Sequence, residues 1–559
     1  MEPTPPATDG PSATDDSRAP GTLTTNSVRC DAYADSVALM RAAQHLTALP
    51  GITAASLVMA TEPNLRLLAD AGLLTDEGRA ARPADLIVAL RGAAEAIEGA
   101  LREVPTLLEQ PAAPEADAAD AWVPRALVEA DPATSLALIS TPGPYAAAEA
   151  LKALRGGMHA FVFSDNVPLE QEIRIKEEAH QRGLLAMGPD CGTGMLDGVP
   201  LGFANVLRPG RVGLIGASGT GLQQVSCLLD AAGEGVRQMI GTGGRDLSAE
   251  VGARTTLDAL DLLAADPGCE LIVLVSKPPA PEVAERVVAR AARAGKPVVA
   301  AFLGTERPVA RGQLTGGRVS PGSVSVVGTL RDAVREAVRT LGGAAPEPWT
   351  PPPDVSPGPG RYLRALYAGG TFAYEARQLL PGAATELAPY VPGREVRLPE
   401  RHLVLDLGDD AYTAGRPHPM IDPTVRAAHL RAALADPRTA AVVLDVVLGH
   451  GAGPDPAGAL AAELERGRVT ERGRVTEQGR VTEWGRPPVI AFVVGTEGDP
   501  QGAAAQRERL EEAGARLAPT STDAAEWAVS LVAGRPGPSA HDATPTLRQE
   551  AEHDHALGA

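Results

Sequence analysis

The chain has 559 residues and a net charge of −19, a balance that argues against a nucleic-acid-binding or membrane-surface protein. Its hydrophobic content of 44% allows packed cores for about three domains, and aromatic content of only 3% means that Ala, Val and Leu must fill them. The four cysteines are scattered and form no metal-ligand spacing, so we expect reduced thiols, no bound metal and a cytoplasmic protein. No apolar run approaches membrane length and no basic, apolar leader is seen, which predicts neither a membrane span nor a signal peptide.

The first region is predicted to be a tail followed by alternating helices and strands. Residues 1–27 are rich in Pro, Thr, Asp and Ser, which is typical of a disordered tail. An α/β region is predicted over 28–207, with a linker at 111–121 that is rich in Ala, Pro and acidic residues. Before that linker, apolar spacing predicts helices at 36–49, 64–71 and 93–108 and strands at 52–59 and 86–90.

From about residue 125 to 207, short apolar runs alternate with helical patterns, which predicts a parallel sheet with right-handed crossovers. The strands end in turns at Pro142-Gly143, Asp165-Asn166 and Gly188–Cys191. Cys191 follows a strand and could be a nucleophile, but no histidine is near it in the sequence. We therefore favour a structural role for this cysteine.

The second domain, predicted over 208–342, opens with the strongest candidate site. An apolar strand at 211–215 runs into a turn of small residues, and helical spacing follows over 222–232. The first N–H groups of such a helix have no intrahelical acceptor, and the helix dipole favours an anion there. Because glycine strings are weak signals, the alternative is that these glycines only allow a tight turn. The predicted phosphate- or substrate-binding residues are Ser218, Gly219, Thr220 and Gly221.

A second glycine-rich turn follows the next predicted strand, at 236–240. Its residues Gly243, Gly244 and Arg245 are expected to face the same crevice, since neighbouring parallel strands end at one edge of a sheet. Arg245 would supply the positive charge that an anion site needs in an acidic protein, and it is a predicted catalytic residue together with His450 of the third domain. Residues 343–360, dense in Pro, Ala and Gly, are predicted to be a semi-rigid linker.

The third domain, predicted over 361–535, repeats the second. The sequence VIAFVVGTE at 489–497 echoes VVAAFLGTE at 298–306. Arg416 and His418 follow one predicted strand and could bind a carboxylate. Gly449-His450-Gly451 follow another, where a turn and a helix start would place His450 as an acid/base or oxyanion donor. For each histidine the alternative is a loop residue that is satisfied by the backbone.

Two segments are predicted to carry no chemistry. The hexapeptide repeat GRVTE(R/Q/W) at 467–486 has too few copies for a solenoid, and we expect it in an exposed loop or helix end. Residues 536–559 are polar and predicted to form a disordered tail.

Five segments together resemble the FdrA family, a branch of the succinyl-CoA synthetase superfamily: IGASGTG, IGTGGRD, GPDCGTG, GVPLGFAN and DLGDDAYTAGRPHPMID. The resemblance implies a multidomain α/β protein with parallel sheets, in which a Rossmann-like CoA-binding-type domain precedes two flavodoxin-like domains. It implies that the turn at Gly449 is a second phosphate-binding helix start opposite the first. It also implies a cofactor site for CoA, formed by Pro142, Gly143, Asn166 and Asp190.

Three features depart from the superfamily. The glycine-rich phosphate loop that opens its CoA domain is missing between Val28 and Arg91. The loop after the strand at 298–303, which carries a phosphorylated histidine in the superfamily, contains no histidine here, and none occurs between His180 and His402. Nothing in the chain resembles an ATP-grasp domain or a GxxxxGK[ST] loop. A self-sufficient ligase driven by ATP is therefore not expected.

Three functions remain open at this stage. The first is a subunit of an acyl or carbamoyl transferase, like oxamate carbamoyltransferase, that acts through phosphate or carbamoyl phosphate in purine or allantoin nitrogen catabolism, as the resemblance implies. The second is a ligase of the succinyl-CoA type whose missing parts come from a partner. The third is a non-catalytic scaffold that binds a metabolite. For the first two we expect a small anionic substrate (carboxylate, phosphate or carbamoyl phosphate) and other subunits or a homo-oligomer.

Overall fold

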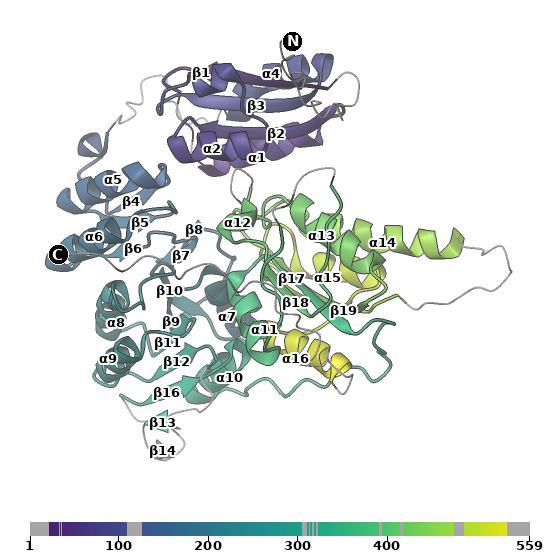
Figure 1. The fold of residues 1–559 in the computed structure, drawn as a ribbon. Helices are drawn as coiled ribbons and strands as arrows, with labels where there is room; N and C mark the ends of the chain where they lie inside the picture. The colour runs from purple at the N-terminus through teal and green to yellow at the C-terminus, as the bar shows by residue number, and fades with distance from the viewer. Residues whose placement is uncertain are drawn as a thin grey trace, which may run out of the picture. The chain divides into compact units, whose positions relative to one another are not determined.

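The computed structural model describes residues 22–32, 34, 36–108, 126–304, 310–311, 314–315, 318–319, 322–388, 390, 394–413, 417–473 and 486–533. The chain divides into two compact units, of which the first extends to Ala121 and the second contains nearly all of the remainder. The predicted fold class is confirmed, because the second unit consists of three α/β domains built on mainly parallel sheets (Figure 1). The predicted linker at 111–121 and tail at 536–559 lie outside the described residues.

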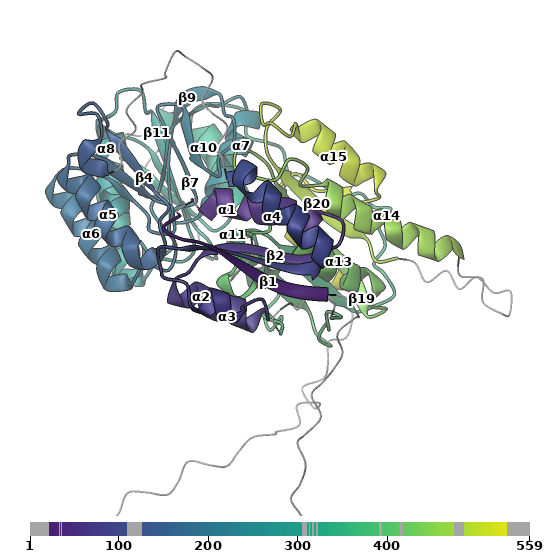
Figure 2. The ribbon, with the colours of Figure 1, turned by 90° about the horizontal axis from the view of Figure 1, so that it is seen from above.

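The first unit is a three-stranded antiparallel sheet of order β1-β3-β2 with helices on both faces (Figure 2). Leu46 and Val104 pack on one face of β3, whereas Leu68 and Leu73 pack on the other. The elements are β1 (Thr22–Arg29), α1 (Ser36–Ala48), β2 (Ile52–Met59), α2 (Glu62–Asp70), α3 (Asp76–Arg79), β3 (Leu86–Ala93) and α4 (Ala94–Leu108).

Strand β1 corrects the prediction that residues 1–27 are a tail. It begins at Thr22 and pairs with β3 along its full length. The strand was not predicted because its sequence is polar. One of its polar side chains, that of Asn26, is buried and forms structural hydrogen bonds. That side chain donates a hydrogen bond to the carbonyl of Leu73 and accepts one from the N–H of Thr75, each 2.7 Å long.

The second unit opens with a three-stranded parallel sheet of order β4-β5-β6. This is the predicted Rossmann-like domain, and alanines at every third or fourth position let α5 pack closely on it. Its elements are η1 (Leu127–Glu129), β4 (Leu136–Ile139), α5 (Gly143–Arg155), β5 (His159–Val162), α6 (Leu169–Gln181) and β6 (Ala186–Met187).

The second domain has an eight-stranded sheet of order β13-β16-β12-β11-β9-β10-β7-β8, whose core strands are parallel. The sheet takes in β7 and β8, which precede the predicted boundary at residue 208. The elements are β7 (Thr193–Leu196), β8 (Val199–Gly202), β9 (Pro209–Gly216), α7 (Gly219–Ala231), β10 (Val236–Gly241), α8 (Arg254–Ala265), β11 (Leu271–Ser276), α9 (Pro281–Ala291), β12 (Val298–Phe302), β13 (Ala310–Arg311), β14 (Leu314–Thr315), β15 (Arg318–Val319), β16 (Val324–Val327) and α10 (Leu330–Thr340).

The third domain is a five-stranded parallel sheet of order β18-β17-β19-β20-β21. Helix α14 contains the first residues of the hexapeptide repeat, and 474–485 lie outside the described residues. The elements are β17 (Tyr362–Tyr367), α11 (Gly370–Leu379), β18 (Leu403–Asp406), α12 (Asp410–Thr413), α13 (Thr424–Ala435), β19 (Thr439–Val447), α14 (Gly458–Gly473), β20 (Val489–Val494), α15 (Ala503–Glu512), β21 (Arg516–Leu517) and α16 (Ser521–Val532).

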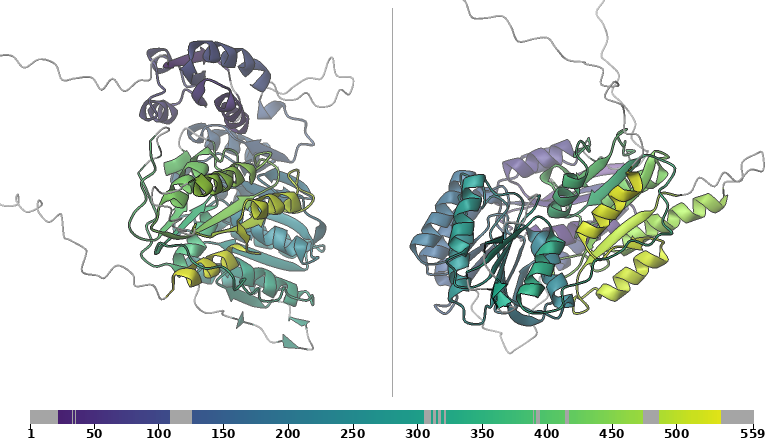
Figure 3. Two further views of the ribbon diagram at one scale, coloured as in Figure 1. Left: turned by 90° about the vertical axis from the view of Figure 1, so that its right-hand side faces the viewer. Right: turned by 90° about the horizontal axis from the view of Figure 1, so that it is seen from below.

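The second and third domains pack face to face. Helices α7, α10, α11 and α16 lie between the two sheets and share one hydrophobic core with both (Figures 1 and 3). Helices α8 and α9 cover the outer face of the second sheet, and α13, α14 and α15 cover that of the third (Figure 3). The starts of α7 and α11 therefore come from related strands of two domains that share one core.

A buried carboxylate joins the segment before β9 to the third domain. Asp499 accepts hydrogen bonds from the Val206 N–H (2.7 Å), the Asn205 side-chain amide (2.8 Å) and the Thr496 N–H (2.8 Å). Three charge-assisted bonds to one buried carboxylate are expensive to lose, because each donor would remain unsatisfied.

We predict that Asp499→Ala lowers the free energy of unfolding by about 3 kcal/mol or more, since it removes this acceptor from three donors. Urea titration followed by circular dichroism measures the effect. Glu497→Ala is the matched control on the same loop, because Glu497 is exposed and pairs with Arg507 only at 3.7 Å. Its expected loss is below about 0.5 kcal/mol, and an equal loss in the two variants would contradict the role of Asp499.

Candidate functional site

The first helix start of the site follows β9, which ends at Gly216. Ser218 is the N-cap of α7, and its hydroxyl oxygen accepts a hydrogen bond from the Gly221 N–H at 3.1 Å. Among the described residues, no acceptor pairs with the N–H groups of Gly219 and Thr220. These two donors lie at the positive end of the helix dipole, and binding of an anion to them stays a prediction.

The second helix start follows β17, and the sequence prediction did not include it. The N–H groups of Ala368 and Gly369 donate to the Asp445 carboxylate at 2.9 and 3.1 Å. Asp445 is fully buried and forms an ion pair with Arg426, also at 2.9 Å. This internal carboxylate fixes the turn before α11. In the described part of the chain, the next two N–H groups, of Gly370 and Thr371, have no acceptor.

The two helix starts are in direct contact. The hydroxyl of Ser218 hydrogen-bonds to the hydroxyl of Thr371 across the domain boundary. On one side of this contact, a Cβ placed on Gly369 would lie only 2.8 Å from Oγ1 of Thr220. Four free N–H groups and the positive ends of two helix dipoles thus lie close together. The sequence signal for a binding site at the start of α11 is that Gly369-Gly370-Thr371 repeats the pattern of Ser218-Gly219-Thr220.

Two charged groups that sequence reasoning missed flank the start of α11. A Cβ placed on Gly370 would lie 2.3 Å from Oδ2 of Asp406 and 3.6 Å from Nζ of Lys277. Lys277 follows β11 and Asp406 ends β18, so each stands at the carboxyl edge of its own sheet. Burial raises the pKa of Asp406 to about 6, while Lys277 and the N–H of Gly408 act in the opposite direction.

The predicted turn at Gly243-Gly244-Arg245 has contacts within the protein and not a free cation. Arg245 forms an ion pair with the buried Glu172 at 2.8 Å and donates to the Val167 carbonyl at 2.7 Å. A Cβ on Gly243 would lie 2.2 Å from the Pro189 carbonyl oxygen, so glycine there permits close packing of the two domains. The prediction that Gly243, Gly244 and Arg245 bind substrate is therefore not supported by their geometry, because Arg245 is already paired.

The turn at Gly449-His450-Gly451 also differs from its prediction. The N–H of His450 donates to the Ala204 carbonyl at 2.8 Å, and the two residues form an isolated β-bridge. The His450 side chain is exposed, and α14 begins only at Gly458. No helix start follows this turn directly, so the second start is that of α11. The two glycines are needed because Ala204 and Phe203 pack against them.

The other predicted pair of the third domain is not assembled by the described residues. Arg416 lies outside the described residues. Nδ1 of His418 accepts a hydrogen bond from the Met420 N–H at 3.2 Å. Burial and, to a lesser extent, the positive charge of Arg426 lower the pKa of His418 to about 4. A neutral imidazole with one nitrogen used by the backbone is a poor partner for a carboxylate. The geometry of His418 therefore favours the alternative that it is a loop residue whose side chain is hydrogen-bonded to the backbone.

The four residues predicted to bind CoA are brought together at the carboxyl edge of the sheet β4-β5-β6. Gly143 begins α5, and a Cβ there would lie 2.3 Å from the Asp165 carbonyl oxygen and 2.6 Å from the carbonyl of Asn166. The N–H of Asp190 donates to Ser164 on the adjoining turn at 3.0 Å. Pro142, Gly143, Asn166 and Asp190 therefore lie at one edge of this sheet, and their binding of CoA stays a prediction.

This edge does not fit the diphosphate of CoA. The second residue of α5, Pro144, has no N–H, and the N–H of Tyr145 is used by Pro142. The turns at 140–142, 163–168 and 188–192 contain no basic residue, while Asp165 and Asp190 add negative charge. A phosphate group placed here would meet two acids and a blocked helix start, so we derive no chemical step through CoA.

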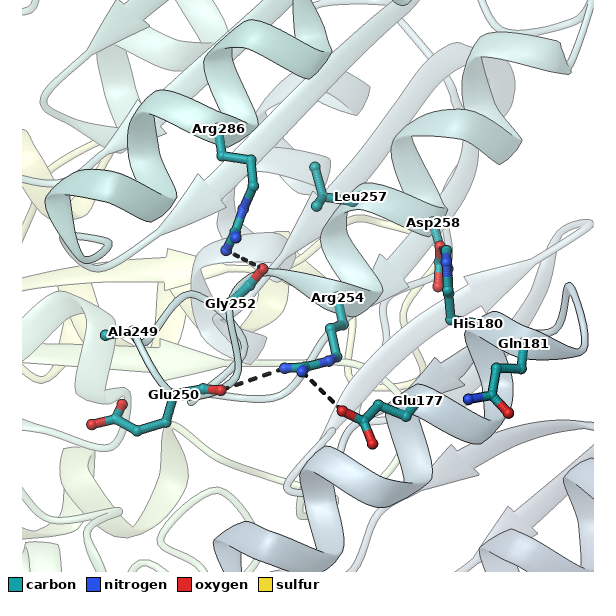
Figure 4. Close-up of a pocket in the computed structure, with 10 residues that line it drawn as sticks. All are labelled: Glu177, His180, Gln181, Ala249, Glu250, Gly252, Arg254, Leu257, Asp258 and Arg286. Atoms are coloured by element: carbon teal, nitrogen blue, oxygen red, sulfur yellow. Dashed lines mark hydrogen bonds and ion pairs between the residues drawn. The ribbon is translucent and has the colours of Figure 1, made fainter.

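A pocket with a volume of about 400 Å³ lies between α6 of the Rossmann-like domain and the segment 249–258 and α9 of the second domain (Figure 4). Four of its charged groups are paired: His180 with Asp258 at 2.7 Å, and Arg254 with Glu177 at 3.0 Å. Arg286 donates to the Gly252 carbonyl at 2.6 Å. The pocket therefore has its own internal pairing and is separate from the helix-start site.

Comparison with known proteins places the chain in a class. Residues 366–531 match the CoA-ligase family, and residues 22–123 match a family described as AllF, heavy metal-associated domain. The fold and these matches define a protein of the acyl-CoA synthetase and succinyl-CoA ligase superfamily. The chain is 36% identical over 504 residues to the protein YahF of Escherichia coli (strain K12), which covers 89% of this chain and 96% of that protein. It therefore belongs to the YahF family within this superfamily.

More distant similarities include subunits of CoA ligases. The mitochondrial succinate–CoA ligase [ADP-forming] subunit alpha-2 of Trichomonas vaginalis is 28% identical over 179 residues, 31% of this chain and 57% of that subunit. Among solved structures, the dinucleotide-forming acetyl-coenzyme A synthetase 1 of Ca. Korarchaeum cryptofilum is 16% identical, with coverage of 76% of this chain and 88% of that chain and a TM-score of 0.32.

The first unit contains a single cysteine, Cys30, which is exposed just after β1. In the part of the chain that the structure describes, no group of three or more His, Cys, Asp or Glu side chains could hold a metal ion. None of the described helices is both long enough and apolar enough to span a membrane.

Cys191 is buried, and burial raises the pKa of its thiol to about 12. A thiol with so high a pKa is a poor nucleophile at neutral pH, which supports the structural interpretation of this cysteine.

We predict that iodoacetamide at pH 8 modifies Cys30 in the native protein and leaves the three buried cysteines unmodified. Mass spectrometry of the labelled chain checks this, with the urea-unfolded protein as the control in which all four react. Rapid native labelling of Cys191 would contradict it.

Proposed function

We propose that the chain is an FdrA-type subunit of an acyl or carbamoyl transferase, which moves the group to or from a phosphate held at the starts of α7 and α11. One observation carries this proposal: the unpaired N–H groups of Gly219, Thr220, Gly370 and Thr371 converge beside the hydroxyls of Ser218 and Thr371. Such donors stabilise the negative charge of a phosphate and of the tetrahedral intermediate that forms when it attacks a carbonyl.

The chemistry is direct transfer without a phosphorylated histidine, because the chain has no histidine between His180 and His402. Positioning of phosphate beside the acyl donor and stabilisation of developing charge are then the main sources of rate acceleration. Other subunits would complete the enzyme, and purine or allantoin nitrogen catabolism is the proposed setting. Ureido acids related to oxamate are the proposed carbamoyl donors.

A second candidate is an acyl-CoA ligase whose ATP-grasp domain and phosphohistidine are contributed by a partner. The match of residues 366–531 to the CoA-ligase family favours it. The acidic carboxyl edge around Asp165 and Asp190 weighs against it, since CoA would have to bind without basic residues there. Calorimetry with millimolar CoA separates the candidates, because heat of binding is expected only for the ligase.

The assay for the leading proposal is phosphorolysis. The chain, alone and with the products of neighbouring genes, is incubated with phosphate and ureido acids related to oxamate, and carbamoyl phosphate is measured. Formation of carbamoyl phosphate that depends on the chain is the expected result. Its absence in every combination would overturn the transferase.

At the level of residues, Gly219→Val should abolish most phosphate binding while the fold is retained. The φ of Gly219 is not in the left-handed region, and the nearest atom to a Cβ there is Oγ1 of Thr193 at 3.1 Å. The valine side chain would fill the space beside the free N–H groups. Isothermal calorimetry with phosphate measures the loss, and unchanged binding by a folded Gly219→Val variant would show that the turn is only structural.

Ser218→Ala should weaken phosphate binding about fivefold, since one hydrogen bond is worth roughly 1 kcal/mol. The variant also loses a helix cap, so Thr329→Ala is the matched control. Thr329 caps α10 in the same way, by accepting from the Asp332 N–H at 3.1 Å, and α10 follows a strand three positions from β9 in the sheet. Both variants should lose similar stability, but only Ser218→Ala should lose phosphate affinity. Equal affinity in the two would contradict a contact to Ser218.

A further inference from the structure

Lys277 has a charge that the fold does not use. Its side chain is exposed at the carboxyl end of β11, and among the described residues it has neither a hydrogen bond nor an ion pair. Two other cations near the carboxyl edge of this sheet are paired, in contrast: Lys176 of α6 with Asp246 at 2.7 Å, and Arg245 with Glu172 at 2.8 Å. An unpaired ammonium next to free N–H groups is what an anionic ligand would require.

Asp406 is the opposite case, a carboxyl group beside a site for anions. It ends β18 and is half-buried, and its Oδ1 accepts from the Gly408 N–H at 3.1 Å. The charged groups that face it come from three elements: Lys277 after β11, Arg377 on α11 and Asp409 on its own turn. Burial outweighs the two cations and raises the pKa of Asp406 to about 6. This carboxyl group therefore exchanges its proton close to neutral pH.

The two side chains are placed so that one small ligand can contact both. Oδ2 of Asp406 and Nζ of Lys277 lie 2.3 and 3.6 Å from the same point, the position of a Cβ on Gly370. Although both lie near this point, the two side chains form no ion pair with each other among the described residues. Gly370 is the first residue of α11, and its N–H has no acceptor in the described part of the chain.

We propose that Lys277 and Asp406 are catalytic residues of this site, in which Lys277 holds the phosphate and Asp406 exchanges a proton with it. This rests on the proposed function. In the direction of phosphorolysis, an oxygen of hydrogen phosphate forms a bond to the carbonyl carbon of the acyl donor. The bond from that carbon to the leaving group breaks, and its electron pair stays with the leaving atom. The phosphate proton passes to the Asp406 carboxylate and from there to the leaving atom, so that atoms and charge balance.

Sulfate is the sharpest probe of this assignment, because it resembles phosphate but does not itself titrate between pH 5 and 8. A bound dianion disfavours the ionised form of a neighbouring carboxyl group and raises its pKa. Sulfate binding near pH 6.5 should therefore be accompanied by proton uptake, and the affinity should fall as the pH rises from 5 to 8. Calorimetry in two buffers of different ionisation enthalpy measures the number of protons taken up.

The expected results for the variants are distinct. Asp406→Asn should bind sulfate without this proton uptake, and several-fold more tightly than the parent at pH 8, because it removes a negative charge while keeping an acceptor for the Gly408 N–H. Lys277→Met should bind sulfate at least about fivefold more weakly at all pH values. Asp409→Asn is the matched control, since Asp409 is an exposed carboxylate on the same turn whose Oδ1 accepts from the Ala411 N–H at 3.0 Å. Its proton uptake should equal that of the parent.

Proton uptake that survives in a folded Asp406→Asn variant would overturn the role of Asp406, and unchanged affinity in Lys277→Met would overturn that of Lys277. Both outcomes leave the proposed function intact, provided that Gly219→Val still abolishes binding. If Gly219→Val binds sulfate like the parent, or if the parent binds neither sulfate nor phosphate, the anion site itself fails and this assignment fails with it. Once a turnover assay exists, the acid limb of the pH profile near pH 6 should be absent in Asp406→Asn.

Discussion

The packing of α7 and α11 between two parallel sheets is the constraint on which the site depends. Each helix follows a strand of its own domain, and the domains share one core that includes Leu222 from α7 and Phe372 from α11. Because that core is close-packed, the N-terminal turns of the two helices have little freedom to separate. The hydrogen bond between Ser218 and Thr371 is a consequence of this packing, and so is the convergence of two helix dipoles.

An acidic chain must keep its own carboxylates out of an anion site, and the structure shows where many of them are used. Asp246 accepts from the N–H groups of Thr255 and Thr256 at the start of α8, and Glu375 accepts from Leu330 at the start of α10. Asp445 fills the turn just before α11. Internal acids thus satisfy several helix starts of these domains. The starts of α7 and α11 differ because, among the described residues, no carboxylate accepts from the N–H groups of Gly219, Thr220, Gly370 and Thr371, although Asp406 lies next to Gly370.

Much of the fold could be predicted from the sequence, since buried parallel strands are continuous apolar runs such as Ala441–Val447 and helices have regular apolar spacing. Strand β1 could not, because its stability comes from pairing with β3 and from the buried amide of Asn26, and neither leaves an apolar pattern. The first helix start was predicted because strand, small residues and helix follow one another directly. Lys277 and Asp406 were missed for a physical reason: they are about 130 residues apart and come close only when the second and third domains pack face to face. Arg245 was predicted to be free for a substrate because it is a cation in a glycine-rich turn. The sequence does not show that its side chain is paired with Glu172 on α6.

The contact between the two helix starts also limits where the proposed anion could bind. The Ser218–Thr371 hydrogen bond holds the starts at the distance of two hydroxyl groups, too close for a phosphate to lie directly between them. On one side of this contact, Thr220 approaches Gly369 so closely that even a Cβ there would clash with its hydroxyl. At Gly370, by contrast, the atoms nearest to the position of a Cβ belong to Asp406 and Lys277. The glycine at 370 is therefore a requirement of the site, because any side chain would occupy the place where the free N–H groups, the ammonium and the carboxyl group can reach the same ligand.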